Sequence, residues 1–309
     1  MTDKKGKDGG CGMVKNSVSV LGYAKINLHL DVTGRLEGGY HSVATVMQTI
    51  SLHDEISVMR SDREGLTLEC NVAGIPTDGK NLAVRAAELF CQQVRVRPNA
   101  HIVIDKRIPM AAGLAGGSAD AAATLLAMNL VYGEPLSIDD LLTLAARLGA
   151  DVPFCLLGGT AYGEGRGDLL QPLTAMPDCY IAVACGGEGV STPWAYGLLD
   201  RVYDDFLEKS SYRPVPTDAL KLALKNGDLS AIASSIYNIF ESPVLAERPV
   251  AKRVRKQMME GGAMGAMMSG SGPSVFGIFG DEDDARTTVR RLQEEGIFAS
   301  VCRPIARKW

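Results

Sequence analysis

Apolar and polar residues alternate strictly along residues 17–32. Even positions carry apolar or small side chains, whereas odd positions are mainly polar. A period of two residues predicts a long β-strand with one apolar face and one polar face. Lys25, Asn27 and His29 share the polar face at a spacing of roughly 6.6 Å. A solvated outer face is the ordinary interpretation of such a row, and a row of functional side chains is the alternative.

Glycine, proline and capping residues separate the elements that follow. Asn81 is expected to be the N-cap of a helix, and Pro109 is expected to end a strand. A loop of small residues then runs into a helix rich in alanine and leucine. Ser137 and Asp140 form a capping-box pair ahead of a further helix, which Gly149 ends.

The second half of the chain mixes helices and strands. It predicts a strand at 180–186, helices at 217–240 and 248–260, two strands around a glycine turn at 266–280, a charged helix at 281–295 and a last strand. Because strands and helices do not alternate regularly, the pattern favours an α+β fold over a doubly wound sheet. The length of 309 residues suggests two domains. We expect a disordered tail (1–16), a first domain (17–165) and a second domain (166–309).

Composition and charge exclude several classes of protein. Hydrophobic residues make up 46% and charged residues 22%, as in an ordinary globular chain and unlike a disordered one. The 32 basic residues stand against 36 acidic ones, so no overall basic field attracts nucleic acid or anionic lipid. No segment reads as a membrane span or signal peptide. The seven cysteines and four histidines form no zinc or disulfide pattern, and the chain is expected to be cytoplasmic.

The strongest chemical signal is residues 109–123, where a glycine-containing loop leads into a helix. Free backbone N–H groups and the positive end of the helix dipole make such a junction an anion site. The segment is neither a Walker A loop nor a Rossmann fingerprint, and a plain flexible connection is the alternative. The glycine loop at 269–272 is either a similar feature or a hairpin turn. Asp151 follows a helix C-terminus, where the dipole disfavours a carboxylate; this hints at function, although a surface aspartate is equally common.

Together these segments resemble the GHMP kinase superfamily, which includes galactokinase and the homoserine, mevalonate and phosphomevalonate kinases. The early strand, PMAAGLAGGSADAA and SGSGPSVFG carry the superfamily resemblance. YAKINLHLDVTGRLEGGYH, LGADVPFCLLGGTAYGEGRG and STPWAY narrow it to members that phosphorylate a cytidine-diphosphate-linked methylerythritol. The resemblance implies a two-domain GHMP kinase fold, with a ribosomal-protein-S5-like N-terminal domain and a ferredoxin-like C-terminal domain. It also implies ATP-dependent phosphorylation of the 2-hydroxyl of 4-diphosphocytidyl-2-C-methyl-D-erythritol in the non-mevalonate isoprenoid pathway.

The resemblance assigns roles to matching positions of this chain. Lys25 and Asp151 are expected to be the catalytic pair. Tyr196 is expected to lie against the cytosine, with Trp194 as the weaker candidate. The substrate site is expected to comprise Asn27, Tyr40, His41, Tyr196, Ser269, Gly270 and Ser271. The ATP site is expected to comprise Pro109, Met110, Ala111, Ala112, Gly113, Leu114, Ala115, Gly116, Gly117, Ser118 and Ala119, with Lys106 and Asn81 as further candidates.

Three alanines distinguish this phosphate loop from the more glycine-rich loops of many relatives. A left-handed backbone costs an alanine roughly 1 kcal/mol or more. Ala111, Ala112 and Ala115 are therefore expected to have ordinary dihedral angles, and the glycines of the loop are expected to take any strained ones.

The resemblance also implies the partners. These are ATP, Mg²⁺ held mainly through the ATP phosphates with no metal site named on the protein, and a small molecule with a cytidine diphosphate group. Nucleic-acid and membrane partners are not expected, and the protein is expected to be a monomer or a weak homodimer. Another GHMP kinase, of the mevalonate, homoserine or sugar type, is one alternative, although paired aromatics suit a flat base better. A non-catalytic nucleotide-binding protein is the other, although a mere binder does not need both Lys25 and Asp151.

Overall fold

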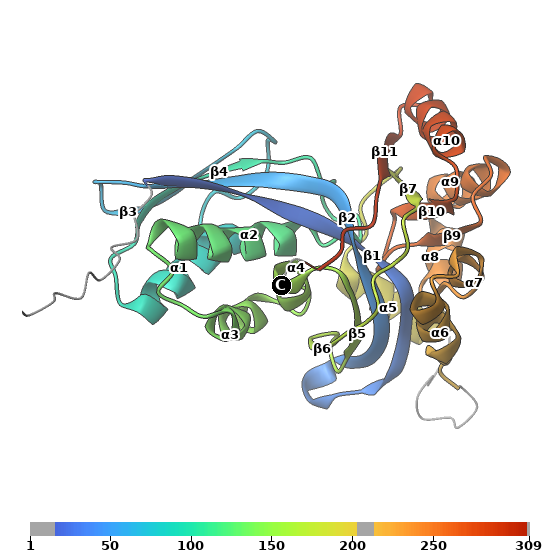
Figure 1. The fold of residues 1–309 in the computed structure, drawn as a ribbon, viewed down its shortest axis with the longest axis horizontal. Coiled ribbons are helices and arrows are strands. Elements are labelled where there is room, and N and C mark those ends of the chain that lie inside the picture. The colour runs from blue at the N-terminus through green and yellow to red at the C-terminus, as the bar shows by residue number, and fades with distance from the viewer. Residues whose placement is uncertain (1–15, 203–212, 308–309) are drawn as a thin grey trace, which may run out of the picture.

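The computed structural model describes residues 16–202 and 213–307 (Figure 1). All but the last residue of the predicted tail therefore lies outside the described residues. Two sheets organise the described chain, one of seven strands and one of four. Helices and strands are mixed in both halves, which confirms the α+β prediction. No helix within these two ranges is long and apolar enough to cross a membrane.

The seven-stranded sheet has the order β3-β4-β2-β1-β8, with β5 paired to β2 and β6 paired to β5. Its strands are β1 (Ser17–Arg35), β2 (His41–Arg60), β3 (Gly65–Cys70), β4 (Asn99–Asp105), β5 (Thr160–Glu164), β6 (Leu169–Pro172) and β8 (Tyr237–Asn238). A short 3-10 turn, η1 (Glu37–Gly39), links β1 to β2. The predicted domain boundary at residue 165 falls in the turn between β5 and β6, and it stays a prediction.

Helices cover one face of this sheet (Figure 1). They are α1 (Leu82–Val94), α2 (Gly116–Val131), α3 (Ile138–Leu148) and α4 (Val152–Leu157). The Asn81 side chain caps α1 by accepting a hydrogen bond from the N–H of Ala83 at 2.9 Å, as predicted. Ser137 and Asp140 form the predicted capping box of α3. Local sequence therefore sets where α1 and α3 begin.

The four-stranded sheet is antiparallel and has the order β11-β7-β10-β9. Its strands are β7 (Tyr180–Cys185), β9 (Gly265–Met268), β10 (Val275–Phe279) and β11 (Phe298–Cys302). Helix α9 (Pro249–Glu260) precedes β9, and α10 (Glu282–Glu294) joins β10 to β11. This chain order and strand order are those of a ferredoxin-like domain, so that prediction is confirmed.

Between β7 and α9 lie helices α5 (Thr192–Val202), α6 (Asp218–Asn226), α7 (Leu229–Ser234) and α8 (Glu241–Glu247). The helices predicted at 217–240 are present as α6 and α7, but the prediction is wrong beyond Ser234, where β8 follows. Gly227 ends α6 in the left-handed region at φ +67°, and β8 pairs with β1 of the first sheet. A sequence pattern does not reveal such a two-residue strand, because its pairing partner lies far away in the chain.

The polar face of β1 is buried, so the solvated interpretation of this row is wrong. Lys25, Asn27 and His29 are 5%, 2% and 1% exposed. Ile26 and Leu28, on the apolar face, share a buried cluster with Ile181 and other residues of the second sheet. Alternation identifies the strand but not what covers each face, and here both faces are covered.

Candidate active site

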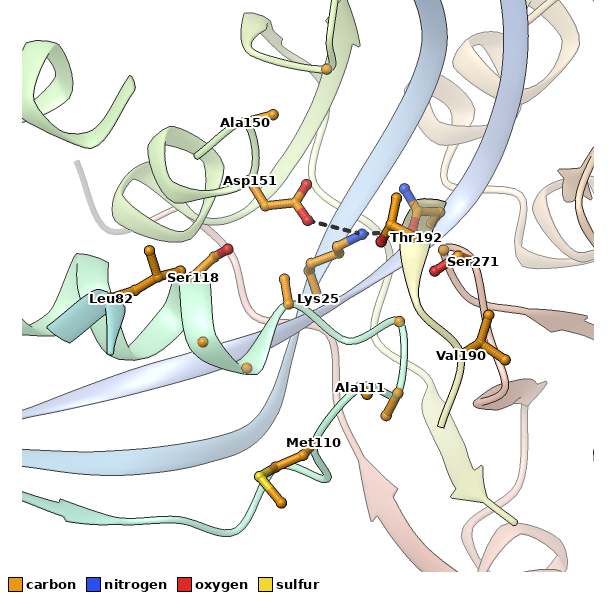
Figure 2. A pocket seen from close by; sticks show the side chains of 18 of the residues that line it. Lys25, Leu82, Met110, Ala111, Ser118, Ala150, Asp151, Val190, Thr192 and Ser271 are labelled. Atoms are coloured by element: carbon orange, nitrogen blue, oxygen red, sulfur yellow. Dashed lines mark hydrogen bonds and ion pairs between the residues drawn. The ribbon is translucent and has the colours of Figure 1, made fainter. Parts of the chain in front are cut away.

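A cavity of about 570 Å³ lies between the two halves of the molecule (Figure 2). Its wall combines β1, β2, the loop before α2, the start of α4, α5 and the loop between β9 and β10. The predicted site residues in this wall are Lys25, Asn27, Asn81, Lys106, Pro109, Met110, Ala111, Ala112, Gly113, Ala115, Gly116, Gly117, Ser118, Asp151, Tyr196, Gly270 and Ser271. Segments far apart in the sequence therefore meet at one cavity.

Five predicted site residues are not part of this wall. Leu114, Ala119 and Ser269 are buried behind it. Tyr40 is 59% exposed, and the Arg166 guanidinium lies 5.7 Å from the centre of its ring. His41 contacts the wall through Tyr196.

The predicted catalytic pair is assembled at the centre of the cavity. The Lys25 Nζ lies 3.7 Å from Asp151 Oδ2 and donates a hydrogen bond to Asn27 Oδ1 at 2.8 Å (Figure 2). The Asn27 amide donates in turn to Thr45 Oγ1 at 2.8 Å, and that hydroxyl donates to the His29 carbonyl. A buried ammonium is costly unless it is paired and hydrogen-bonded, and this chain of contacts meets that condition.

Asp151 sits at the N-cap position of α4, a helix that the sequence analysis missed. The premise that its carboxylate follows a helix C-terminus and gains nothing from a dipole is therefore incomplete, because a second helix begins at the next residue. Its side chain makes no capping hydrogen bond and is 39% exposed. The carboxylate consequently has one side against Lys25 and another open to the cavity, as a proton acceptor requires.

The phosphate loop does not follow the expected distribution of dihedral angles. Ala111 and Ala115 adopt φ values of 49° and 57°, in the left-handed region, as Gly113 does at 75°. Gly116 and Gly117 are helical residues of α2. The expectation of ordinary dihedral angles is wrong for Ala111 and Ala115.

Contacts from outside the loop explain how the alanines are held. The carbonyl of Ala111 accepts from the N–H of Val190 at 3.1 Å, and that of Ala112 accepts from Ser274 at 3.2 Å. The carbonyl of Leu114 accepts from the N–H of Lys25 at 3.2 Å. Tertiary hydrogen bonds thus outweigh a backbone preference of about 1–2 kcal/mol per residue.

The late glycine loop supports the phosphate loop directly. The Ser269 hydroxyl donates to the Gly113 carbonyl at 3.0 Å. Asn238, which the sequence analysis did not identify, donates from its amide to the carbonyls of Met268 and Gly270 at 2.8 Å each. Ser269 therefore positions the phosphate loop, whereas Gly270 and Ser271 face the cavity.

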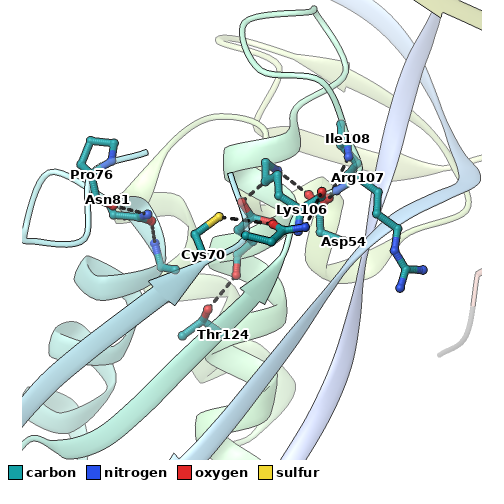
Figure 3. A network of polar contacts seen from close by, with 11 residues as sticks. Asp54, Cys70, Pro76, Asn81, Lys106, Arg107, Ile108 and Thr124 are labelled. Atoms are coloured by element: carbon teal, nitrogen blue, oxygen red, sulfur yellow. Dashed lines mark hydrogen bonds and ion pairs between the residues drawn. The ribbon is translucent and has the colours of Figure 1, made fainter. Parts of the chain in front are cut away.

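A buried ion cluster lies under the first turn of α2 (Figure 3). The Lys106 ammonium pairs with Asp54 and with Asp120 Oδ2, the latter at 3.0 Å. Burial raises the pKa of the Asp120 carboxyl, and its Oδ1 has no hydrogen-bond partner in the described chain. A Cβ atom on Gly116 would lie 2.9 Å from the Lys106 Nζ, so glycine leaves room for the ammonium. Asp54 and Asp120 were not predicted, since their role depends on a lysine distant in sequence.

An aromatic group closes the opposite end of the cavity. The rings of His41 and Tyr196 stack at 4.6 Å with an interplanar angle of 22°, and Phe240 contacts Tyr196 edge-on at 4.8 Å. Burial raises the pKa of Tyr196 to about 12, so the phenol is neutral. Trp194 lies outside the wall, under the Arg248 guanidinium. Here His41, rather than Tyr40, is the ring stacked on Tyr196.

Comparisons with known proteins identify the family. The model for the N-terminal domain of GHMP kinases matches residues 81–159, and the model for their C-terminal domain matches residues 220–297. A curated 4-diphosphocytidyl-2-C-methyl-D-erythritol kinase from Synechococcus sp. is 43% identical over 262 residues, covering 84% of each chain. This chain belongs to the GHMP kinases.

Further relatives and solved structures support the membership of this chain in the GHMP kinases. A protein of the same name from Caldicellulosiruptor saccharolyticus is 41% identical, over 91% of this chain and 95% of its own. A crystal structure of 4-(cytidine 5'-diphospho)-2C-methyl-D-erythritol kinase is 35% identical, with a TM-score of 0.77 over 93% of this chain and 99% of that one. A homoserine kinase from Cytophaga hutchinsonii, 20% identical with a TM-score of 0.73 over 96% and 97% of the two chains, shares the fold.

Proposed function

We propose that this GHMP kinase transfers a phosphoryl group from ATP to the 2-hydroxyl of 4-diphosphocytidyl-2-C-methyl-D-erythritol. The curated relatives above carry the name of that activity. The observation that carries the proposal is the Lys25–Asp151 pair at 3.7 Å, set between the phosphate loop and Tyr196. A nucleotide-binding protein without catalysis would not need a carboxylate and an ammonium at this point.

In the proposed mechanism, Asp151 and Lys25 have different roles in phosphoryl transfer. The transition state is loose and in line, so catalysis consists mainly of positioning and charge stabilisation. The Asp151 carboxylate accepts the proton of the substrate hydroxyl. The Lys25 ammonium, fixed by Asn27, stabilises the negative charge on the transferred group. Products are ADP and the 2-phosphate ester.

The phosphates of ATP are proposed to lie on the backbone amides of residues 113–118, at the positive end of α2. Asn81 and Lys106 line that side of the cavity, which supports a position of the nucleoside there. Mg²⁺, when bound, neutralises charge on the phosphate oxygens. Within residues 16–202 and 213–307 no three His, Cys, Asp or Glu side chains gather to hold a metal, so we propose that ATP supplies most of its ligands.

A coupled assay of ADP release tests the function. We expect turnover with the cytidine-diphosphate-linked methylerythritol, and at most marginal turnover with mevalonate or homoserine. Turnover with mevalonate or homoserine alone would assign the enzyme to another branch of the GHMP kinases. Binding of an ATP analogue without turnover of any of these alcohols would favour a non-catalytic role.

A further inference from the structure

The loop between β9 and β10 reaches the cavity through Gly270 and Ser271. Both line the wall, and Figure 2 shows the Ser271 side chain there. Because Gly270 has no side chain, its share of the wall is backbone. Within residues 16–202 and 213–307, the N–H of Gly270 and the N–H and hydroxyl of Ser271 make no hydrogen bond. The wall therefore holds hydrogen-bond donors that have no partner in this part of the chain.

Asn238 holds this loop, although it does not line the cavity itself. It is 4% exposed, and its Nδ2 donates to the carbonyls of Met268 and Gly270 at 2.8 Å each. Its Oδ1 accepts from the N–H of Phe240 at 2.9 Å, which fixes the end of the amide that faces the loop. The Gly270 carbonyl is thus engaged by a buried amide, whereas the Gly270 N–H is not.

The loop that Asn238 holds is fitted to the phosphate loop. The Ser269 hydroxyl donates to the Gly113 carbonyl at 3.0 Å, and a Cβ on Gly270 would lie 2.9 Å from the same oxygen. Asn238 is itself part of β8, which pairs with β1 at Leu30. The Asn238 side chain therefore ties the loop to the strand that carries the proposed catalytic lysine.

We propose that Asn238 is a positioning residue that holds the carbonyls of this loop away from the cavity, and so leaves the donors of Gly270 and Ser271 for phosphate oxygens. A carbonyl oxygen repels a phosphate, whereas N–H and O–H groups donate strong, charge-assisted hydrogen bonds to it. The proposal rests on the proposed function, because ATP and a substrate with a diphosphate bring such oxygens to the cavity. The contact of the loop with Gly113 favours ATP as their source.

The main test is Asn238→Asp. A carboxylate oxygen in place of Nδ2 would face the two carbonyls as acceptor against acceptor, so the carbonyls should turn away from it. We expect KM for ATP to rise about tenfold or more, with KM for the cytidine-diphosphate-linked substrate changed less than about twofold. The reverse split would assign the donors to the diphosphate of that substrate. A merely structural role would lower the amount of folded enzyme and leave both KM values unchanged.

The matched control is Asn129→Asp, the same substitution at another buried asparagine. Asn129 is 7% exposed, and its side chain donates to the Leu136 carbonyl and accepts from the Leu136 N–H, each at 3.0 Å. It lies near the C-terminal end of α2, whereas the phosphate loop precedes the N-terminal end. This variant should lose stability, as Asn238→Asp does, but should keep both wild-type KM values.

Ser271→Ala supplies a second test, because it removes one donor and leaves the contacts of Asn238 in place. It should raise the same KM by about threefold or more. Wild-type KM values for both substrates in folded Asn238→Asp would overturn the proposal. Should that variant not fold, wild-type values in Ser271→Ala would overturn it.

Binding measurements separate this proposal from the proposed function. If the wild type turned over none of the alcohols tested, the proposed function would fail. Calorimetric titration of the wild type and Asn238→Asp with an ATP analogue and with CDP would then decide the role of Asn238. Weaker binding of either ligand by the variant would support it, and equal affinities of the two proteins for both ligands would overturn it.

Discussion

At the scale of single residues, the site depends on charged side chains held out of water. Lys25 is 5% exposed, and its ammonium contacts Asn27 and Asp151. The buried Lys106 is shared by two carboxylates. Such groups are costly to bury without partners, and each of these two ammonium groups is paired with a carboxylate.

The proposed catalytic role of Asp151 predicts a large loss of turnover from a substitution that keeps its shape. Asp151→Asn keeps the shape but removes the proton acceptor, so kcat should fall by about 10²–10⁴ with little change in ATP affinity. Lys25→Met should lower kcat comparably, and the double variant should be far from additive because the two act as a unit. Asp178→Asn, at a side chain 83% exposed, is the control and should retain full activity. Retention of more than about a third of kcat in Asp151→Asn would rule out this base.

Substitution of Gly116 is expected to affect KM for ATP more than the stability of the fold. The Cβ of Gly116→Ala would meet the Lys106 Nζ at 2.9 Å and displace the ammonium. KM for ATP should therefore rise by about tenfold or more. The melting temperature should also fall, because the displaced ammonium weakens its buried pairs with Asp54 and Asp120, but by less in proportion, since alanine is the better helix former. Gly79→Ala, where a Cβ meets nothing within 4 Å, is the matched control. An unaltered KM for ATP would show that Lys106 has no part in nucleotide binding.

At the scale of elements, two loops from different halves of the chain are fitted to each other. Gly113 in the phosphate loop and Ser269 in the loop between β9 and β10 are in direct contact. A Cβ on Gly113 would lie 2.2 Å from the Ser269 carbonyl oxygen, and its φ is +75°. The loop therefore needs glycine here for both space and backbone conformation.

Gly113→Ala is expected to destabilise the protein beyond the cost of the backbone alone. A left-handed alanine costs about 1–2 kcal/mol, and the clash with Ser269 adds to it. Gly227→Ala, which has φ +67° and open space around it, carries only the backbone cost. Urea unfolding should show a clearly larger loss for Gly113→Ala, together with a loss of activity. Equal losses would mean that the two loops adjust freely.

The sequence predicted those elements that depend on nearby residues, such as alternation along a strand or a capping residue before a helix. The alternation of β1, the Asn81 cap and the Ser137 capping box all appear as expected. Helix α4 was missed, because six residues carry too little periodicity. The left-handed Ala111 depends on a hydrogen bond from a segment almost 80 residues away, which no local preference reveals.

The sequence predicted which segments form the site, but not the distances and contacts between them. The resemblance placed Lys25, Asp151 and the phosphate loop, and the structure brings them to one cavity. Partners such as Asp120 and Asn238 were not found, since their importance comes from atoms that meet only in the fold. The catalytic and binding roles themselves stay predictions until the variants above are measured.

At the scale of the whole molecule, stability depends on a neutral histidine in the centre. His29 is 1% exposed, and its Nε2 has no hydrogen-bond partner among the described residues. Burial, and then the charge of Lys221, lower its pKa to about 4 from the usual 6.5. Protonation therefore favours the unfolded chain between these two values.

This predicts a loss of stability in mild acid. As the pH falls from 6.5 toward 4, His29 binds a proton in the unfolded state but not in the folded state. This lowers the free energy of unfolding by about 3 kcal/mol. In urea unfolding between pH 7.5 and pH 5, the wild type should lose about 2 kcal/mol more than His29→Gln, which does not titrate at this position. The raised pKa of Asp120 acts in the opposite direction, but it does so in both proteins and cancels from this comparison. Parallel profiles for the two proteins would contradict the role given to His29.

The pairing of β8 with β1 has a consequence for folding during synthesis of the chain. It pairs with His29 and Leu30 on the edge of β1 but is made about 200 residues later. At ribosomal speeds of about 5–20 residues per second, β1 therefore waits roughly 10–40 s for this neighbour. An uncovered strand edge pairs readily with other chains. The nascent protein thus passes through an interval in which this part of β1 is open to misassembly, and chaperone demand should be greatest before residue 238 leaves the ribosome.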